Sequence, residues 1–215
     1  MNLVFIGPPA AGKGTQARII STKFGLYWIA VGEILRERAK IDDALGQKIR
    51  QYQASGRLLP KDGIVGVLSE ALSRTEAKAG FILDGFPRNL EQAEIFAVML
   101  KQLGIELSVV IKLDLDEAEI VKRIMGRIVC SSCKANYHEQ YNLPKIAGVC
   151  DFCGGTKFSK RADDTLEVVK SRIAEYQQTE KMADYYADLG LLRVIRSGGN
   201  IAEVTKQIEE VIKEL

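Results

Sequence analysis

The chain begins with a short apolar run that leads directly into the glycine-rich stretch GPPAAGKGT, residues 7–15, and a segment of helical period follows. Glycines let the backbone turn tightly so that N–H groups converge on an anion, and a helix N-terminus adds positive dipole. Lys13 stands where a lysine reaches the terminal phosphates of a nucleotide. Gly14 takes the place of the usual Ser or Thr, and Thr15 comes next. The pattern favours a loop for a nucleoside triphosphate over a glycine-rich turn without a ligand.

Strand-like and helix-like segments alternate along the chain. Helical period is evident at residues 13–24 and 162–189. Runs of β-branched and aromatic residues predict strands at 2–6, 27–31, 81–84, 108–113 and 191–195. This alternation predicts an α/β fold with a parallel five-stranded sheet and helices on both of its faces.

Two stretches interrupt the alternation and predict insertions into one core. Residues around 32–60 have helical patterns without a strand between them, and about 126–164 is a loop-rich segment that contains every cysteine. The predicted core therefore comprises residues 1–30, 60–125 and 165–215. The first insertion spans 31–59 and the second spans 126–164.

Composition narrows the class of protein. The chain has 215 residues, of which 47% are hydrophobic and 27% charged, and a net charge of +2. That charge is too small to indicate a nucleic-acid or membrane-surface binder. Apolar runs stay well short of the roughly 20 residues of a membrane span, and the start does not resemble a secretory signal. We therefore expect a cytoplasmic protein, in whose reducing surroundings paired cysteines act as metal ligands rather than disulfides.

The four cysteines form two matched pairs, C-S-S-C and C-D-F-C, with sixteen residues between them. This spacing is typical of a zinc ribbon, in which four thiolates surround one ion at about 2.3 Å. Four protein ligands leave no open position, so the expected Zn²⁺ is structural, and a chance pairing of free cysteines is the alternative. His138 is then surplus and is expected at the surface or beside the ligands. The predicted ligands are Cys130, Cys133, Cys150 and Cys153.

A second motif, FILDGFPRNLEQA, lies at residues 81–93. Asp84 ends a predicted strand, where a carboxylate can hold the waters around Mg²⁺. Arg88 offers a rigid fork of donors for a phosphate, although the segment alone could be a tight turn with a solvated arginine. Together with the Gly-Lys-Gly-Thr variant of the loop and Gln16 after it, this motif resembles the adenylate kinases, which move a phosphoryl group between ATP and AMP.

The resemblance implies a P-loop NTPase-type core flanked by helices, with a helical insertion that binds the nucleoside monophosphate and a zinc-ribbon lid. It also implies ATP, AMP and ADP as partners, Mg²⁺ bound with ATP, a monomer, and no nucleic acid or membrane. A lid of about forty residues is too small to be held by hydrophobic burial alone, which gives the metal its purpose.

The resemblance carries over to the site position by position. For ATP it implies Gly7, Gly12, Lys13, Gly14, Thr15, Arg123, Arg127 and Asn200. For AMP it implies Val31, Gly32, Arg36, Arg57, Leu59, Ile64, Gly85, Arg88, Gln92, Arg161 and Arg172. The implied catalytic cations are Lys13, Arg88, Arg123, Arg161 and Arg172, and the implied carboxylates of the Mg²⁺ water network are Glu33 and Asp84. Arg123 and Arg127 stand four residues apart, which places them on one helix face.

The chemistry of phosphoryl transfer agrees with this set of residues. The transition state is loose, so a protein mainly positions the reactants and neutralises charge. A phosphate acceptor is already anionic and needs no general base. A site rich in arginine, in a chain with one histidine, therefore suits transfer to a nucleoside monophosphate.

Three positions depart from the family pattern and keep an alternative open. Val31 lacks the hydroxyl that the family usually has near the monophosphate base. Glu33 has a longer arm than the usual aspartate, and Ala10 replaces a usual glycine, which is tolerable only at negative φ. A kinase for UMP or CMP is therefore the first alternative. A zinc-ribbon nucleic-acid binder is the second and weaker one, because only Lys134 and Lys145 add cations between the cysteines.

Overall fold

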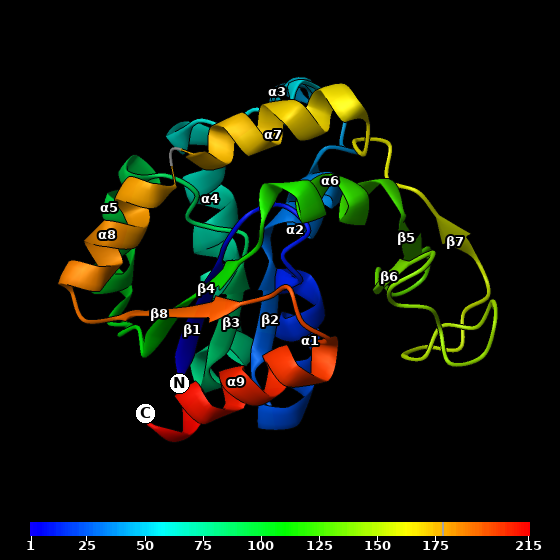
Figure 1. Ribbon diagram of the computed structural model, residues 1–215. Coiled ribbons are helices and arrows are strands. Elements are labelled where there is room, and N and C mark those ends of the chain that lie inside the picture. The colour runs from blue at the N-terminus through cyan, green and yellow to red at the C-terminus, as the bar shows by residue number, and fades with distance from the viewer. Residues whose placement is uncertain (178) are drawn as a thin grey trace.

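The computed structural model describes residues 1–177 and 179–215, and the side chains of residues 62 and 180 lie outside the description. A five-stranded sheet with helices on both faces forms the main body, and a small second sheet extends from one side (Figure 1). The elements are β1 (Asn2–Ile6), α1 (Lys13–Phe24), β2 (Tyr27–Ala30), α2 (Val31–Arg38), α3 (Ala44–Ser55), α4 (Lys61–Leu72), η1 (Thr75–Ala79), β3 (Phe81–Asp84), α5 (Leu90–Leu103), β4 (Val109–Asp114), α6 (Glu117–Met125), β5 (Arg127–Cys130), β6 (Asn136–His138), β7 (Phe158–Ser159), α7 (Leu166–Gln177), α8 (Glu180–Asp188), β8 (Leu192–Arg196) and α9 (Ile201–Lys213).

The main sheet has the order β2-β3-β1-β4-β8, and each pair of neighbouring strands is parallel. The prediction of a parallel five-stranded sheet is confirmed, with strand ends within one residue of those expected. Because all strands run the same way, their carboxyl ends lie at one edge. The loop after β1 and the end of β3 both emerge at that edge, where α/β sheets bind ligands.

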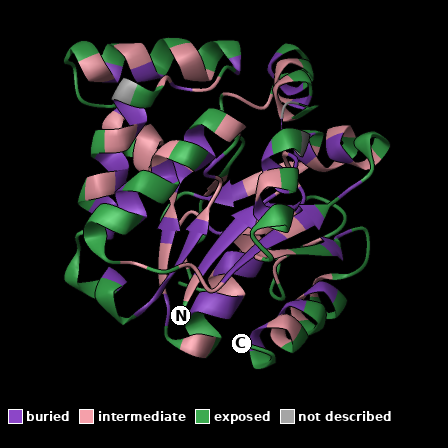
Figure 2. Cartoon of the chain, turned by 90° about the vertical axis from the view of Figure 1, so that its left-hand side faces the viewer, coloured by how far each residue is buried: buried purple, intermediate pink, exposed green. Residues whose placement is uncertain are grey.

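Alternate residues of the central strand β1 enter two separate cores. Val4 and Ile6 pack with α4, α5 and α8 on one face, whereas Leu3 and Phe5 pack with α1, α6 and α9 on the other. This alternation is the period of two that a strand imposes on its side chains. Both faces are covered at the centre of the sheet, so β1, β3 and most of β4 are apolar and buried (Figure 2), whereas the edge strand β8 is largely exposed.

The second sheet is antiparallel, with the order β6-β5-β7, and it carries the cysteine segment. Its hydrophobic cluster is small: the buried members among the described residues are Cys130, Ala135, Tyr137 and Cys150. The helix α6 leads into this sheet and α7 leads out of it (Figure 1).

Two expectations about helices are wrong. The segment 162–189 is not one helix, because α7 ends at Gln177 and α8 begins after Thr179, whose hydroxyl donates to the Arg88 carbonyl at 2.9 Å. Arg123 and Arg127 do not share a helix either, since α6 ends at Met125 and Arg127 opens β5. Among the described residues, no helix is both long and apolar enough to cross a membrane.

Candidate active site and metal centre

The loop between β1 and α1 has the backbone of an anion-binding turn. Gly7 has φ +141°, and a Cβ there would lie 2.3 Å from the carbonyl oxygen of Leu113 on the neighbouring strand β4. Gly12 caps α1 with φ +89°. Both positions require glycine, the first for space and the second for backbone conformation.

The Lys13 side chain folds back onto the phosphate loop and bonds to its backbone. Its ammonium group donates to the carbonyl oxygens of Gly7 at 2.8 Å and Pro8 at 2.7 Å. Burial lowers the pKa of Lys13 to about 8; the charge of Asp84 opposes this shift, and the charge of Arg88 adds to it. A phosphate group in the loop would favour the charged lysine and reverse the shift.

Ala10 adopts φ +60°, in the left-handed region. The condition of negative φ, under which alanine was expected to be tolerable, is therefore not met. An L-residue in this conformation costs about 1–2 kcal/mol relative to the right-handed region, so the loop holds Ala10 under local strain.

A cavity of about 540 Å³ opens at the carboxyl edge of the sheet, between the phosphate loop, α2, the end of β3 and the small sheet. The predicted site residues that line it are Gly7, Gly12, Lys13, Gly14, Thr15, Gly32, Glu33, Arg36, Asp84, Gly85, Arg88, Arg123, Arg127, Arg161, Arg172 and Asn200. Residues from distant parts of the chain thus meet around one space large enough for nucleotide-sized ligands.

Two neighbouring carboxylates form ion pairs with arginines of the cavity, and the sequence analysis gave neither carboxylate a role. Asp163 accepts a hydrogen bond from Arg172 and lies 3.8 Å from Arg36. Asp164 accepts two bonds from Arg127, one of them at 2.8 Å from Nε. The pair lies two and three residues after Arg161 in the sequence RADD, which was the available signal. The two carboxylates thus balance part of the positive charge of the cavity.

Glu33 joins α2 to the small sheet. Its carboxylate accepts from Arg36 at 2.6 Å and from Arg161 at 2.8 Å, and Arg161 also donates to Asn136 at 3.0 Å. Burial acts to raise the pKa of Glu33, but the hydrogen bond and charge of Arg36, with the charge of Arg161, outweigh it and hold the pKa below its usual value. Glu33 is therefore ionised and oriented at neutral pH.

Asp84 lies at the phosphate loop. A Cβ on Gly14 would stand 3.2 Å from the Asp84 carboxylate and 3.3 Å from the Asn136 amide, so glycine leaves room for both side chains. Burial raises the pKa of Asp84, and the positive charges of Lys13 and Arg88 offset only part of the rise. A divalent cation held through water would stabilise the ionised carboxylate.

Five of the residues predicted for AMP lie outside the lining of this cavity. Gln92 is buried, and its side-chain oxygen accepts a hydrogen bond from the Arg88 backbone at 2.9 Å. Arg57 is exposed in the turn before α4. The other three, Val31, Leu59 and Ile64, are buried in the hydrophobic core. Their assignment to the base therefore stays a prediction.

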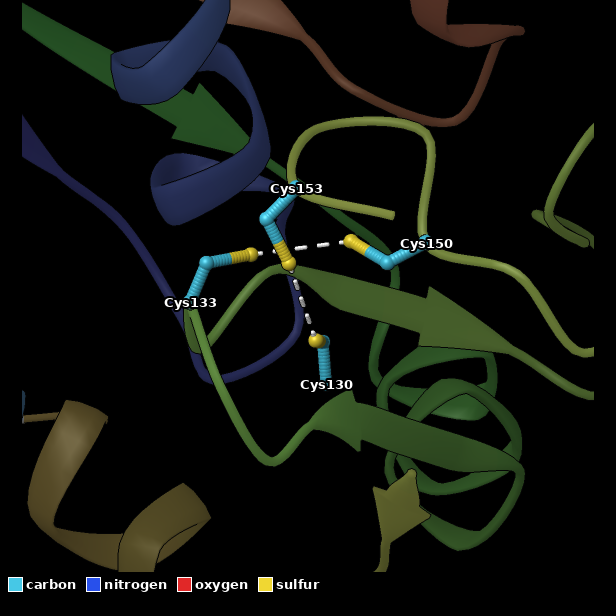
Figure 3. Close-up of side chains that lie close together, drawn as sticks. All are labelled: Cys130, Cys133, Cys150 and Cys153. Atoms are coloured by element: carbon cyan, nitrogen blue, oxygen red, sulfur yellow. Dashed lines mark hydrogen bonds between the residues drawn. The ribbon is translucent and has the colours of Figure 1, made fainter. Parts of the chain in front are cut away.

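The four cysteines converge in space, as Figure 3 shows. All four Sγ atoms lie within 4.8 Å of one another, with 3.5 Å between those of Cys133 and Cys150 and 3.6 Å between those of Cys130 and Cys153. The cysteines are free, and these separations are far longer than the roughly 2.05 Å of a disulfide. Four thiolates around one Zn²⁺ stand about 3.8 Å apart, so this donor set fits zinc.

The surroundings of the sulfurs also suit thiolates. Gly154 has φ +71°, and a Cβ on Gly155 would crowd the Sγ atoms of Cys153 and Cys130 at 3.3 and 3.4 Å. The Tyr137 hydroxyl donates to the Cys150 sulfur at 3.4 Å. Burial disfavours a Cys150 thiolate, but this bond and N–H groups of the second knuckle lower the pKa of the Cys150 thiol to about 6.

His138 is neither at the surface nor beside the cysteines, in contrast to the expectation. It is only 8% exposed, and it stacks on Tyr141 with ring centroids 4.5 Å apart. Its Nδ1 accepts from the backbone N–H groups of Gln140 and Tyr141, and Nε2 lies 3.3 Å from the Lys122 carbonyl oxygen on α6. It therefore joins the small sheet to the helix that leads into it.

A phosphate loop at the edge of a parallel sheet, facing a cavity lined with arginines and two candidate magnesium carboxylates, defines a phosphotransferase for nucleoside phosphates. The sequence profile described as "Adenylate kinase" matches residues 5–191. Curated adenylate kinases are similar over their whole length: one from Carboxydothermus hydrogenoformans is 40% identical over 215 residues, which is all of both chains. One from Archaeoglobus fulgidus is 42% identical over 216 residues, covering 100% of this chain and 99% of its own. The chain belongs to the adenylate kinase family and is a nucleoside monophosphate kinase.

Proposed function

We propose that this member of the family transfers the terminal phosphoryl group of Mg-ATP to AMP, reversibly, to give two molecules of ADP. The supporting observation is the composition of the cavity at the carboxyl edge of the sheet, in which the loop with Lys13 faces Arg36 and Arg88. Two anionic nucleotides can approach from opposite sides while cations from both sides neutralise the phosphates between them.

The proposed roles combine the lining of the cavity with the family resemblance, which alone supports the residues near the base. ATP phosphates bind the backbone N–H groups of the loop, with Gly7, Gly12, Gly14 and Thr15, and Lys13 contacts the terminal phosphate. AMP binds against Gly32, Arg36, Gly85 and Arg88, with its base near Val31, Arg57, Leu59, Ile64 and Gln92. Arg123, Arg127 and Asn200 bind the ATP side, and Arg161 and Arg172 stabilise the transferred group. Glu33 and Asp84 orient waters of Mg²⁺, which neutralises charge on the ATP phosphates when bound.

The chemical step needs no general base, because the acceptor phosphate of AMP is already anionic. The protein contributes orientation, positive charge and exclusion of water, since water in the site would hydrolyse ATP. We propose that the segments 31–59 and 126–164 are the two parts that close over the substrates, and that residues 1–30, 60–125 and 165–215 form the core. Asp163 and Asp164 would release their arginines to the phosphates on closure.

We further propose that Zn²⁺ is bound by Cys130, Cys133, Cys150 and Cys153 as a structural ion. The sulfur separations and the hydrogen bonds to sulfur support this assignment. A monomeric state and a cytoplasmic location are further proposals, which rest on the family resemblance and on composition.

Base preference is the sharpest test, because Val31 leaves a UMP or CMP kinase as the alternative. Phosphoryl transfer from Mg-ATP would be measured with AMP, CMP, UMP and GMP at equal concentrations. We expect AMP to be preferred by at least tenfold, and Val31→Thr to change the rate with AMP by less than about tenfold, the value of one hydrogen bond. Comparable rates with CMP or UMP, restored to AMP preference by Val31→Thr, would contradict the proposal.

A further inference from the structure

Arg18 connects the core to the cysteine segment. It lies on α1, five residues after Lys13, and its side chain reaches the first knuckle of the cysteine cluster. One terminal nitrogen, Nη2, donates to the carbonyl oxygen of Cys133, and the other, Nη1, donates to the Cys133 sulfur at 3.4 Å. A residue of the core thus makes a direct contact with a predicted metal ligand.

The guanidinium group is also enclosed by two aromatic rings from different parts of the molecule. Its central carbon lies 5.2 Å from the ring centroid of Trp28, on strand β2 of the core, and 4.8 Å from that of Phe152, in the second knuckle. Such cation–π contacts add attraction on each side, of about 0.5–2 kcal/mol each. Phe152 is half exposed, so it contributes little to the core of its own segment. Its ring is positioned to cover Arg18.

The charge of the proposed metal cluster explains why a positively charged side chain would be favourable at this contact. Four thiolates and one Zn²⁺ carry a net charge of −2, and a nearby cation that donates to a ligand sulfur stabilises the loaded cluster. Arg18 supplies that cation from outside the segment, across the boundary between core and lid. If the lid moves away from α1, the bond to Cys133 and the contact with Phe152 are both lost.

We propose that Arg18 couples metal binding to closure of the lid, so that a closed lid holds Zn²⁺ more tightly and a loaded cluster favours the closed lid. By thermodynamic linkage, the gain in zinc affinity when the lid closes equals the gain in lid closure when zinc binds. Both come from the Arg18 contact, which stabilises the state that is closed and loaded. The inference rests on the proposed zinc site and adds a positioning residue that lies outside the nucleotide cavity. Arginine is required for this role because a lysine can neither fork between an oxygen and a sulfur nor stack flat between two rings.

The test compares zinc loss with the lid free and with the lid closed. The purified protein is first assayed for one equivalent of zinc, and release to a chromophoric chelator is then followed with and without saturating diadenosine pentaphosphate, a probe that carries two adenosines and five phosphates. Saturation is checked by complete inhibition of phosphoryl transfer. We expect the probe to slow zinc release at least about fivefold in the unaltered protein and less than twofold in Arg18→Gln.

Three further variants make the result specific. Arg18→Lys keeps the charge and should recover only part of the slowing. Phe152→Leu keeps an apolar side chain at a half-exposed position, so it tests the ring without endangering the fold. Lys23→Gln removes one positive charge from the exposed end of the same helix, where the side chain pairs with Glu209, and should behave as the unaltered protein.

Equal slowing in Arg18→Gln and in the unaltered protein would overturn the coupling while leaving the zinc site intact. A protein that binds no stoichiometric zinc would overturn the zinc site, and the coupling with it. The metal assay, which precedes the kinetics, separates these two failures.

Discussion

The sheet core and the cysteine segment are stabilised in different ways. The core buries apolar side chains on both faces of five strands, in two extensive clusters. The hydrophobic cluster of the small sheet has four buried members among the described residues, and two of them are cysteines. A segment with so little apolar burial cannot offset the entropy of ordering its loops, whereas four metal–sulfur bonds can. The molecule thus combines a body held by apolar burial with a small segment in which four cysteine sulfurs converge, where the proposed ion would supply the missing stability.

The comparison extends to charge. The core site holds its arginines and lysine close together in the cavity, and this crowding and burial disfavour the charged form of Lys13. The cysteine cluster does the reverse and gathers negative charge. The first arrangement is suited to binding anions and the second to binding a cation. Changes in the core site should therefore alter the rate of phosphoryl transfer, whereas changes in the cysteine cluster should alter metal content and stability.

Lys13→Met should have the largest effect and should affect only chemistry. Loss of the ammonium group at the transferred phosphate should lower the rate of phosphoryl transfer by about 10³-fold. The free energy of unfolding should change by less than about 1 kcal/mol, because burial already disfavours the charged lysine. Rates and urea unfolding curves would be measured together. A rate within tenfold of that of the unaltered protein, or a large loss of stability, would contradict the claim that Lys13 serves chemistry and not folding.

Removal of the metal should have the next largest effect and should spare the core. We expect the melting temperature to fall by roughly 10 °C, equivalent to about 3 kcal/mol, while the circular dichroism of the main sheet persists. Cys130→Ser should reproduce this loss. The matched core variant Phe96→Ala should lose about 3–5 kcal/mol by leaving a cavity but should retain one equivalent of zinc. Equal stability with and without a chelator, after confirmed loss of metal, would rule out the role of ligation.

The dependence of ATP binding on pH sharpens the contrast in charge. With a pKa of about 8 in the free protein, Lys13 is protonated below pH 8, and ATP binds this charged form. The KM for ATP should therefore change little, by less than about 1.5-fold, from pH 6.5 to 7.5 and should rise about fivefold between pH 8 and pH 9. In Lys13→Arg the side chain stays charged, so KM should be flat over this range. A rise of the same size in the arginine variant would assign the titration to another group.

Ala10→Gly should have the smallest effect. Glycine adopts φ +60° without a steric penalty, and this gain exceeds its greater entropy loss on folding. The free energy of unfolding should increase by roughly 0.5–1 kcal/mol. Chemical denaturation would measure it, and Ala11→Gly at a buried neighbouring position should be destabilising. A less stable Ala10→Gly variant would show that the loop holds Ala10 without strain.

The parts of the molecule that sequence could predict depend on local patterns. The phosphate loop is written in nine consecutive residues, and the strands are apolar runs long enough to be recognised. The cysteines converge because each pair is a short knuckle whose spacing fits one ion. The resemblance to a known family then placed sixteen of the predicted residues around one cavity.

The parts that sequence could not predict depend on contacts between distant residues. Asp163 and Asp164 were visible as charges, but their pairing with Arg172 and Arg127 depends on how α7 returns to the core. His138 contacts the Lys122 carbonyl on α6, sixteen positions away, and the residues next to His138 do not reveal this contact. The break between α7 and α8 involves the Thr179 bond to Arg88, ninety-one positions away.

Trp28 has a practical consequence, since it is the one tryptophan of the chain. Its indole lies on the edge of the nucleotide cavity and carries the Arg18 guanidinium on its ring. The fluorescence of the unlabelled protein therefore comes from the place where core and lid meet. Emission intensity should change when Arg18 moves off the ring, so lid motion can be followed in real time without attaching a dye.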